Sequence, residues 1–251
     1  MVRRAARAAE DEGDLLGAER LLLLLPTDPT VRRWRTELAA RRRLQDSAAP
    51  YSRGLCLLGP AQRWAADGAA RAFMLELAQT ALSEQTSTEC RAGDREAATA
   101  TAAEFDPLVA DVVLFDKDLF SRYLHEALAP FLLLDCGPVS RWGAAPGAVF
   151  EVVAGGQEHH PTTLRRCGLG SAAGGSGAHV APNVVSVIGP VAAAGELVYG
   201  RPVPTGTGEC VLALPPVVLN PVHAGRVQRA LLRRSPATER VRLLARARSC
   251  A

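Results

Sequence analysis

The sequence predicts an α+β fold, in which a helical N-terminal half precedes a small antiparallel β-sheet and a basic C-terminal helical segment. Apolar residues recur at helical spacing up to about residue 135, whereas short valine-rich runs alternate with glycine and proline after it. Helical periodicity returns near the C-terminus. We therefore expect a mainly helical region over 1–135, a strand-rich region with a Gly-rich loop over 136–221 and a basic helical tail over 222–251.

The first 45 residues predict two helices, because the prolines of 26–29 would end one helix and start the next. The spacing from Gly13-Asp14 to Asp28-Pro29 resembles the end of one tetratricopeptide repeat, a family built from helical hairpins. A second copy of this pattern does not follow. We therefore expect a helical hairpin and no repeat array.

The middle of the chain predicts further helices. Residues 62–82 carry apolar side chains at four-residue steps, which is typical of an amphipathic core helix. We expect a loop at 48–60 and a solvated loop or weak helix at 83–104, where large apolar residues are scarce. Asp106 and Pro107 are suited to cap and open another helix.

Two aspartates that follow an apolar run provide the clearest enzymatic resemblance. Residues 109–115 suit either a helix or a buried strand, and Asp116 and Asp118 follow directly. The string resembles the opening motif of haloacid-dehalogenase-like phosphotransferases and the Asp-x-Asp metal motif of many glycosyltransferases. Either resemblance implies a strand that delivers Asp116 as nucleophile or Mg²⁺ ligand, with Asp118 as its partner. However, Leu119 and Phe120 replace the Gly-Thr of the phosphotransferase motif, and in the alternative interpretation Asp118 caps the next helix.

Short runs after Cys136 predict the strands of the sheet, at 148–153, 184–188, 196–199 and 210–214. Ser235 is suited to cap the final helix, with Pro236 in its first turn.

The glycine-rich stretch Gly168–Gly177 is interpreted as a surface loop, because no helix follows it to bind phosphate. Cys167 with His159, His160 and His179 has donor atoms suited to zinc, but the spacing matches no known signature. We therefore predict no metal site there.

The charge of the chain changes sign along its length. Residues 45–135 contain 7 basic and 14 acidic side chains, whereas residues 220–251 contain 8 arginines and one acid, Glu239. Lys117 is the only lysine, so G+C-rich codons explain the choice of arginine. The candidate binding residues are Arg226, Arg229, Arg233, Arg234, Arg240, Arg242, Arg246 and Arg248. This distribution predicts docking on the chain's own acidic middle, or on an acidic partner, ahead of nucleic acid.

We expect a non-enzymatic interaction or scaffold protein, because a helical hairpin and a charged helical segment both provide binding surfaces. The amino-acid usage fits a structural or accessory component of a G+C-rich DNA virus, since G+C-rich genomes, such as those of some actinobacteria or large DNA viruses, favour these residues. One alternative is a Mg²⁺-dependent phosphoryl- or glycosyl-transfer enzyme that uses Asp116 and Asp118. The other is nucleic-acid binding through the C-terminal arginines. No cofactor is expected outside the Mg²⁺ alternative.

The expected partner is a protein, with nucleic acid or an anionic membrane as alternatives. Six widely spaced cysteines without a CxxC pair indicate a reduced compartment. The N-terminus is too charged for a signal peptide, and no stretch has the roughly 20 apolar residues of a membrane span. The sequence therefore predicts an intracellular protein of the cytoplasm or nucleus.

Overall fold

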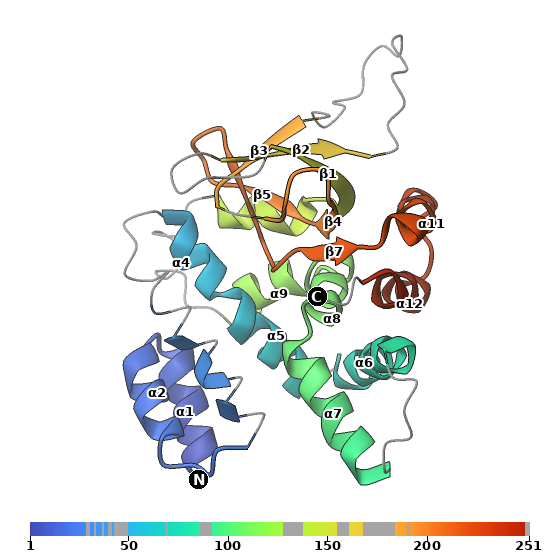
Figure 1. The fold of residues 1–251 in the computed structure, drawn as a ribbon. Helices are drawn as coiled ribbons and strands as arrows, with labels where there is room; N and C mark the ends of the chain where they lie inside the picture. The colour runs from blue at the N-terminus through green and yellow to red at the C-terminus, as the bar shows by residue number, and fades with distance from the viewer. Residues whose placement is uncertain are drawn as a thin grey trace.

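The computed structural model describes residues 1–28, 31–32, 34–36, 38–39, 42, 50–68, 70–85, 92–127, 138–154, 161–167, 184–189 and 191–248. A β-sheet lies against the helical N-terminal half, and two C-terminal helices pack beside both (Figure 1). The predicted α+β class is confirmed. Among the described residues, no helix is both long and apolar enough to cross a bilayer.

Helical structure dominates the first half of the chain. Its elements are α1 (Val2–Asp11), α2 (Leu15–Leu22), α4 (Pro50–Cys56), α5 (Leu58–Asp67), α6 (Arg71–Gln85), α7 (Ala92–Phe105), α8 (Pro107–Asp111), the π-helical turn η1 (Val112–Asp116) and α9 (Leu119–Glu126).

The N-terminal helices form a small core of their own. Helix α2 ends before Pro26, as predicted, and Val31 is again helical. An additional turn separates α1 from α2, because Gly13 adopts a φ of +83° and the Asp14 side chain accepts a hydrogen bond from the Gly17 amide at 2.8 Å. The apolar cluster of this unit comprises Ala6, Leu15, Ala18, Leu22, Val31, Trp34 and Leu38.

A buried ion pair joins this N-terminal unit to the rest of the helical region. The Glu10 carboxylate pairs with the Arg63 guanidinium of α5, and the Trp34 indole N–H donates to the same carboxylate at 3.0 Å. Glu10 and Arg63 are 2% and 4% exposed. Their mutual neutralisation is therefore required for either charge to be buried.

One segment predicted as a loop is helical, and a second, predicted as a solvated loop or a weak helix, also contains a helix. Helices α4 and α5 occupy most of 48–60, and Gly54 allows the close packing: a Cβ there would lie 2.5 Å from Val139 Cγ2 and 2.8 Å from Trp142 Cη2. Helix α7 occupies much of 83–104, and its described buried residues are the small Ala102 and Ala103. The predicted helix 62–82 is divided near Gly68 into α5 and α6.

The second half contains a seven-stranded sheet. After the 3-10 turn η2 (Val139–Ala144), the strands are β1 (Ala148–Ala154), β2 (Thr162–Arg166), β3 (Val184–Val187), β4 (Leu197–Gly200), β5 (Pro202–Pro204), β6 (Cys210–Leu212) and β7 (Val217–Leu219). Their spatial order is β5-β6-β3-β2-β1-β4-β7. The β3–β6 pairing is parallel and the other five pairings are antiparallel, so the predicted antiparallel sheet is in fact mixed. Strands β1, β3, β4 and β6 match predicted runs, whereas β2, β5 and β7 were not predicted.

Alternating side chains give the sheet two apolar faces. Val149 and Tyr199 belong to the cluster formed with α6, α8 and α12, whereas Phe150, Val152 and Leu164 join a separate cluster on the opposite face. Among the described residues, helices therefore pack on the face of the sheet that carries Val149 and Tyr199.

The C-terminal segment folds as helices α11 (Pro221–Leu232) and α12 (Ala237–Ala247). Asn220 caps α11, since its side chain accepts a hydrogen bond from the Val222 amide at 3.0 Å. Ser235 does not cap α12. Its amide instead donates to the Ala230 carbonyl at 3.0 Å and closes the C-terminus of α11, where Arg234 adopts a φ of +52°.

Candidate functional site

The apolar stretch before Asp116 is helical, so the strand implied by the two enzyme resemblances is wrong. Asp106 caps α8 by accepting a hydrogen bond from the Leu108 amide at 2.8 Å, and η1 continues the helix with buried residues 112–115. Asp118 then adopts a φ of +55° and precedes α9, but its side chain makes no capping hydrogen bond. The predicted cap is therefore correct in position only.

The two aspartates do not share a site. The Asp116 carboxylate lies 2.9 Å from Arg201 Nη2 and 2.7 Å from Arg240 Nη1, whereas Asp118 is exposed. In the part of the chain that the structure describes, no three His, Cys, Asp or Glu side chains are grouped as metal ligands. The structure thus brings Asp116 to two arginines rather than to Asp118.

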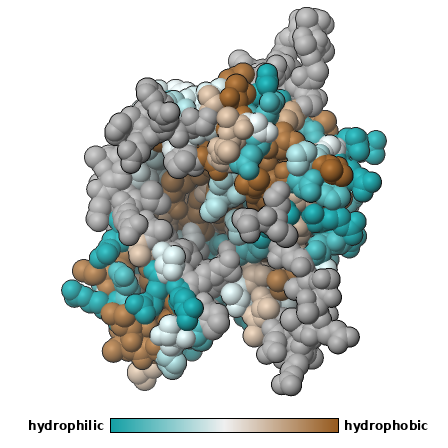
Figure 2. Space-filling model, in the orientation of Figure 1, coloured by the Kyte–Doolittle hydropathy of each residue, from teal (hydrophilic) through white to brown (hydrophobic). Residues whose placement is uncertain are grey.

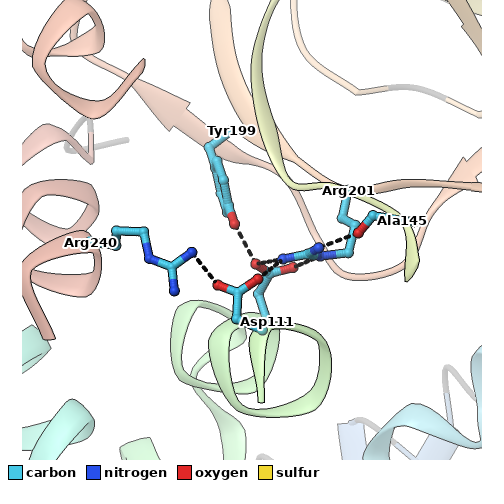
Figure 3. A network of polar contacts seen from close by, with 6 residues as sticks. Asp111, Ala145, Tyr199, Arg201 and Arg240 are labelled. Atoms are coloured by element: carbon cyan, nitrogen blue, oxygen red, sulfur yellow. Dashed lines mark hydrogen bonds and ion pairs between the residues drawn. The ribbon is translucent and has the colours of Figure 1, made fainter. Parts of the chain in front are cut away.

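A buried polar network lies where the sheet meets the helices (Figure 3). Arg201 Nε and Nη2 donate to the two carboxylate oxygens of Asp111 at 2.8 and 2.9 Å, which is a bidentate pair. The Tyr199 hydroxyl donates to Asp111, and Arg201 Nη1 donates to the Ala145 carbonyl. The Arg201 guanidinium also lies 4.7 Å from the centre of the Phe115 ring.

Burial sets the protonation states of this network. Burial and the charge of Asp111 raise the pKa of Tyr199 well above its ordinary value, so the phenol is neutral. Burial lowers the pKa of Arg201, but the charge and hydrogen bonds of Asp111, together with smaller electrostatic contributions from Tyr199 and Asp116, outweigh that effect and the net shift is upward. Burial raises the pKa of Asp116, against the lowering influence of Arg201. In its ionised form the network balances two carboxylates against Arg201 and Arg240.

Glycine is required beside the network. A Cβ on Gly147 would lie 2.5 Å from Tyr199 Oη and 3.1 Å from Arg201 Nη2, which is too close for an alanine side chain. Because Asp111, Tyr199 and Arg201 are buried and bind one another, we interpret the network as a structural junction between α8, the sheet and α12 rather than as a reacting centre.

The arginines of α12 dock on the acidic middle of the same chain, as the charge distribution predicts. Arg240 pairs with Asp116 at 2.7 Å, and Arg246 pairs with Glu84 at 2.9 Å. Arg242 Nε lies 3.7 Å from Glu84. The remaining contact is between Arg248 and Asp106, at 3.5 Å. Half of the candidate arginines therefore hold α12 against α6, α8 and η1.

The arginines at α11 are placed differently. Arg226, Arg229, Arg233 and Arg234 are exposed. Within the described residues none of these four takes part in an ion pair. Helix α11 lies at the outer edge of the molecule (Figure 1). Its buried side is apolar apart from Gln228, which accepts a hydrogen bond from the Val149 amide of the sheet at 3.3 Å.

We call the outward side of α11 the basic face and define it by Val222, Gly225, Arg226, Arg229, Leu232 and the C-cap residue Arg233, with Arg234 following directly. At 3.6 residues per turn, the first six project to one side of the helix. Val222 and Leu232 are 80% and 53% exposed. In Figure 2 the edge of the molecule where α11 lies is largely hydrophilic with isolated hydrophobic residues. The basic face thus combines positive charge with exposed apolar side chains.

The other predicted site residues contribute little to either feature. His159, His160, His179 and Gly168–Gly177 lie outside the described residues. Cys167 is described, and burial raises the pKa of its thiol, so it is a poor nucleophile at neutral pH.

Comparison with protein-family models, with curated proteins and with solved structures found no match to the chain. Function must therefore be inferred from the geometry alone.

Sequence reasoning missed the centre of the network. Asp111 is a charged residue inside an otherwise apolar run, and a charge in such a position indicates a buried ion pair. Arg201 is one of four basic residues between 136 and 219, and it directly follows a strand. Neither observation identifies which residue pairs with which, because Asp111 and Arg201 are 90 positions apart in the sequence.

Proposed function

We propose that this chain is a non-enzymatic interaction protein that binds an acidic protein partner through the basic face of α11. One observation carries the proposal. The arginines of α12 neutralise acids of the same chain, whereas Arg226, Arg229, Arg233 and Arg234 are exposed beside Val222 and Leu232. Arginine and exposed apolar side chains together are typical of protein-binding surfaces.

A second copy of this chain is a poor occupant for the basic face. In the described part of residues 45–135, seven acids pair with arginines of the chain, namely Asp67, Glu84, Glu104, Asp106, Asp111, Asp116 and Glu126. The acids that remain unpaired in the described part of this region, such as Glu76 and Glu96, are scattered rather than clustered. Charge complementarity therefore favours a different protein.

Nucleic acid and membrane fit the basic face less well. Helix α11 presents no aromatic side chain for stacking on unpaired bases. Its apolar exposure is confined to Val222 and Leu232, near the two ends of the helix, whereas an interfacial helix buries a continuous apolar side in lipid. Both remain outcomes of the test.

The test replaces three arginines of the basic face together, as Arg226→Glu, Arg229→Glu and Arg233→Glu. Exposed ion pairs contribute about 0.2–1 kcal/mol each, and reversal adds repulsion, so we expect affinity for an acidic protein segment to fall about tenfold or more. The probe is a fluorescein-labelled peptide of glutamate and leucine, about 18 residues long so that it forms a helix. Fluorescence anisotropy gives the Kd.

The matched control reverses three exposed arginines of the N-terminal helices, Arg4, Arg20 and Arg32, and changes the net charge by the same amount. It should bind the peptide as the unmodified chain does. Parallel titrations use a DNA duplex of about 20 base pairs and phosphatidylserine vesicles at about 0.15 M salt. Tighter binding to DNA or to vesicles than to the peptide, or equal losses in both triple variants, would refute an acidic protein partner at α11.

A further inference from the structure

We propose that the acidic partner docks as a helix laid along α11, with its closest approach at Gly225. The inference rests on the proposed function, since it names the form of the segment that the basic face binds. It starts from a glycine inside a helix, a position where alanine would make the helix more stable.

The packing of this chain does not explain Gly225. A Cβ added there would meet Arg229 Nη1 at 3.9 Å, which is ordinary van der Waals contact, and nothing nearer. Gly54 provides the contrast, because a Cβ there would collide with Val139 and Trp142. Gly54 is therefore required by the interior, whereas the space over Gly225 lies open at the surface of α11.

Gly225 occupies the middle of the exposed side of the helix. Val222, Gly225 and Arg229 follow one another at steps of three and four residues, and Leu232 continues the same line. Because Gly225 has no side chain, the helix surface has a shallow depression between Val222 and the Arg229 guanidinium. A neighbouring helix can bring its backbone or a small apolar side chain close at that point, since small residues permit close helix–helix contact.

The arginines define the chemistry of the occupant. Arg226, Arg229 and Arg233 are spaced by three and four residues, which is the spacing of carboxylates on one side of a facing helix. Val222 and Leu232 give apolar contacts near the two ends of that side. An amphipathic helix with acids beside its apolar stripe therefore matches both features, as in other complexes where a helix lies on an apolar surface.

The experiment compares two fluorescein-labelled peptides of identical composition. One carries glutamates at positions i, i+3 and i+7 beside a stripe of leucines, with its single proline at the N-terminus. The other contains the same residues in a different order, with the proline at the centre, where it prevents helix formation. We expect the helical peptide to bind the unmodified chain about tenfold more tightly than the rearranged one. Gly225→Ala should raise Tm by about 2 °C, yet weaken binding of the helical peptide about tenfold, because the added methyl blocks close approach. Gln79→Ala, at an exposed position of α6, should leave binding unchanged.

The possible failures are distinguishable. If both peptides bind equally and the triple Arg→Glu variant loses both, an acidic partner stands but the helical docking is wrong. If Gly225→Ala is stabilised without any loss of affinity, or is destabilised, the close approach at Gly225 is wrong. If neither peptide binds, the proposed function fails as well. Concentration-dependent dimerisation abolished by Gly225→Ala would assign the face to a second copy and overturn the proposal.

Discussion

Replacement of Arg201 by methionine should be among the most destabilising single changes in this chain. Arg201 gives Asp111 a bidentate pair, contacts Asp116 and donates to the Ala145 carbonyl. In Arg201→Met the Asp111 carboxylate, which is 4% exposed, keeps the Tyr199 hydroxyl but loses its counter-charge. Removal of one partner from a buried pair costs about 3–5 kcal/mol. For a chain of this length that loss corresponds to a fall in Tm of about 8–15 °C.

Urea unfolding followed by circular dichroism measures the free energy directly, and calorimetry gives Tm. The matched control is Arg165→Met on β2. Arg165 also pairs with a carboxylate, that of Glu151 at 2.9 Å, but its side chain is 55% exposed. An exposed pair contributes about 0–1 kcal/mol, so the control should unfold close to the unmodified chain.

The partner residues provide a second check on the reasoning. If Arg201→Met is destabilising because it leaves the Asp111 charge buried without a partner, adding Asp111→Leu to that variant should recover most of the lost stability. Tyr199→Phe is added as well, because the Tyr199 hydroxyl would otherwise lose its acceptor. Additive losses in the combined variant would show that the guanidinium stabilises the fold by packing, for example on Phe115. A loss below about 1 kcal/mol for Arg201→Met alone would refute the burial argument.

Three further predictions concern backbone and pH. Arg234→Gly should stabilise the chain by up to about 1 kcal/mol in urea unfolding, because Arg234 has a φ of +52°; a destabilised variant would contradict this explanation. Gly147→Ala should lower Tm by several degrees, since its Cβ would collide with the Tyr199 hydroxyl, and an unchanged Tm would show that the network can shift. Asp116→Asn tests the raised pKa of Asp116. The raised pKa means that the folded chain binds the Asp116 proton more tightly than the unfolded chain does. The unmodified chain should therefore lose stability, relative to Asp116→Asn, as pH rises from 3.8 through the folded pKa. Urea unfolding of both chains at about pH 4 to about pH 7 measures the difference in their unfolding free energies. If the unmodified chain instead gains stability relative to Asp116→Asn as pH rises, the arginines dominate over burial.

The sequence predicts the parts of this fold that local patterns determine. Asp106-Pro107 marks a helix start, and the valine-rich runs mark β1 and β3, because capping chemistry and strand preference act between neighbours. The segment of α7 was predicted only as a solvated loop or a weak helix, because its described buried residues are alanines, which contribute little to an apolar periodicity. Strand β5 was missed because its prolines indicate a loop, although a sheet edge tolerates them.

The candidate site required distances that no local pattern contains. The charge count predicts that the C-terminal arginines meet the acidic middle, and for α12 this is observed. It does not predict that Arg226 and its neighbours on α11 remain outside, because that depends on which side of each helix faces the core. The apolar positions of each helix decide this. Ala224 and Val227 are buried, so the arginines on the other side of α11 face outward. In α12 the buried residues are Val241 and Leu244, and this orientation brings Arg240 within reach of Asp116.

The division between α11 and α12 also limits what the basic face can do within its own chain. Gln228 and the buried alanines fix the rotation of α11 against the sheet, so its arginines cannot reach the acids of α6 or α8 without exposing Ala224, Val227 and Ala230. Such a rotation would uncover apolar area and leave the Val149 amide without its acceptor, which together outweigh the about 0.2–1 kcal/mol of a surface ion pair. The core therefore holds the positive charge of α11 outward, away from the described acids of α6 and α8.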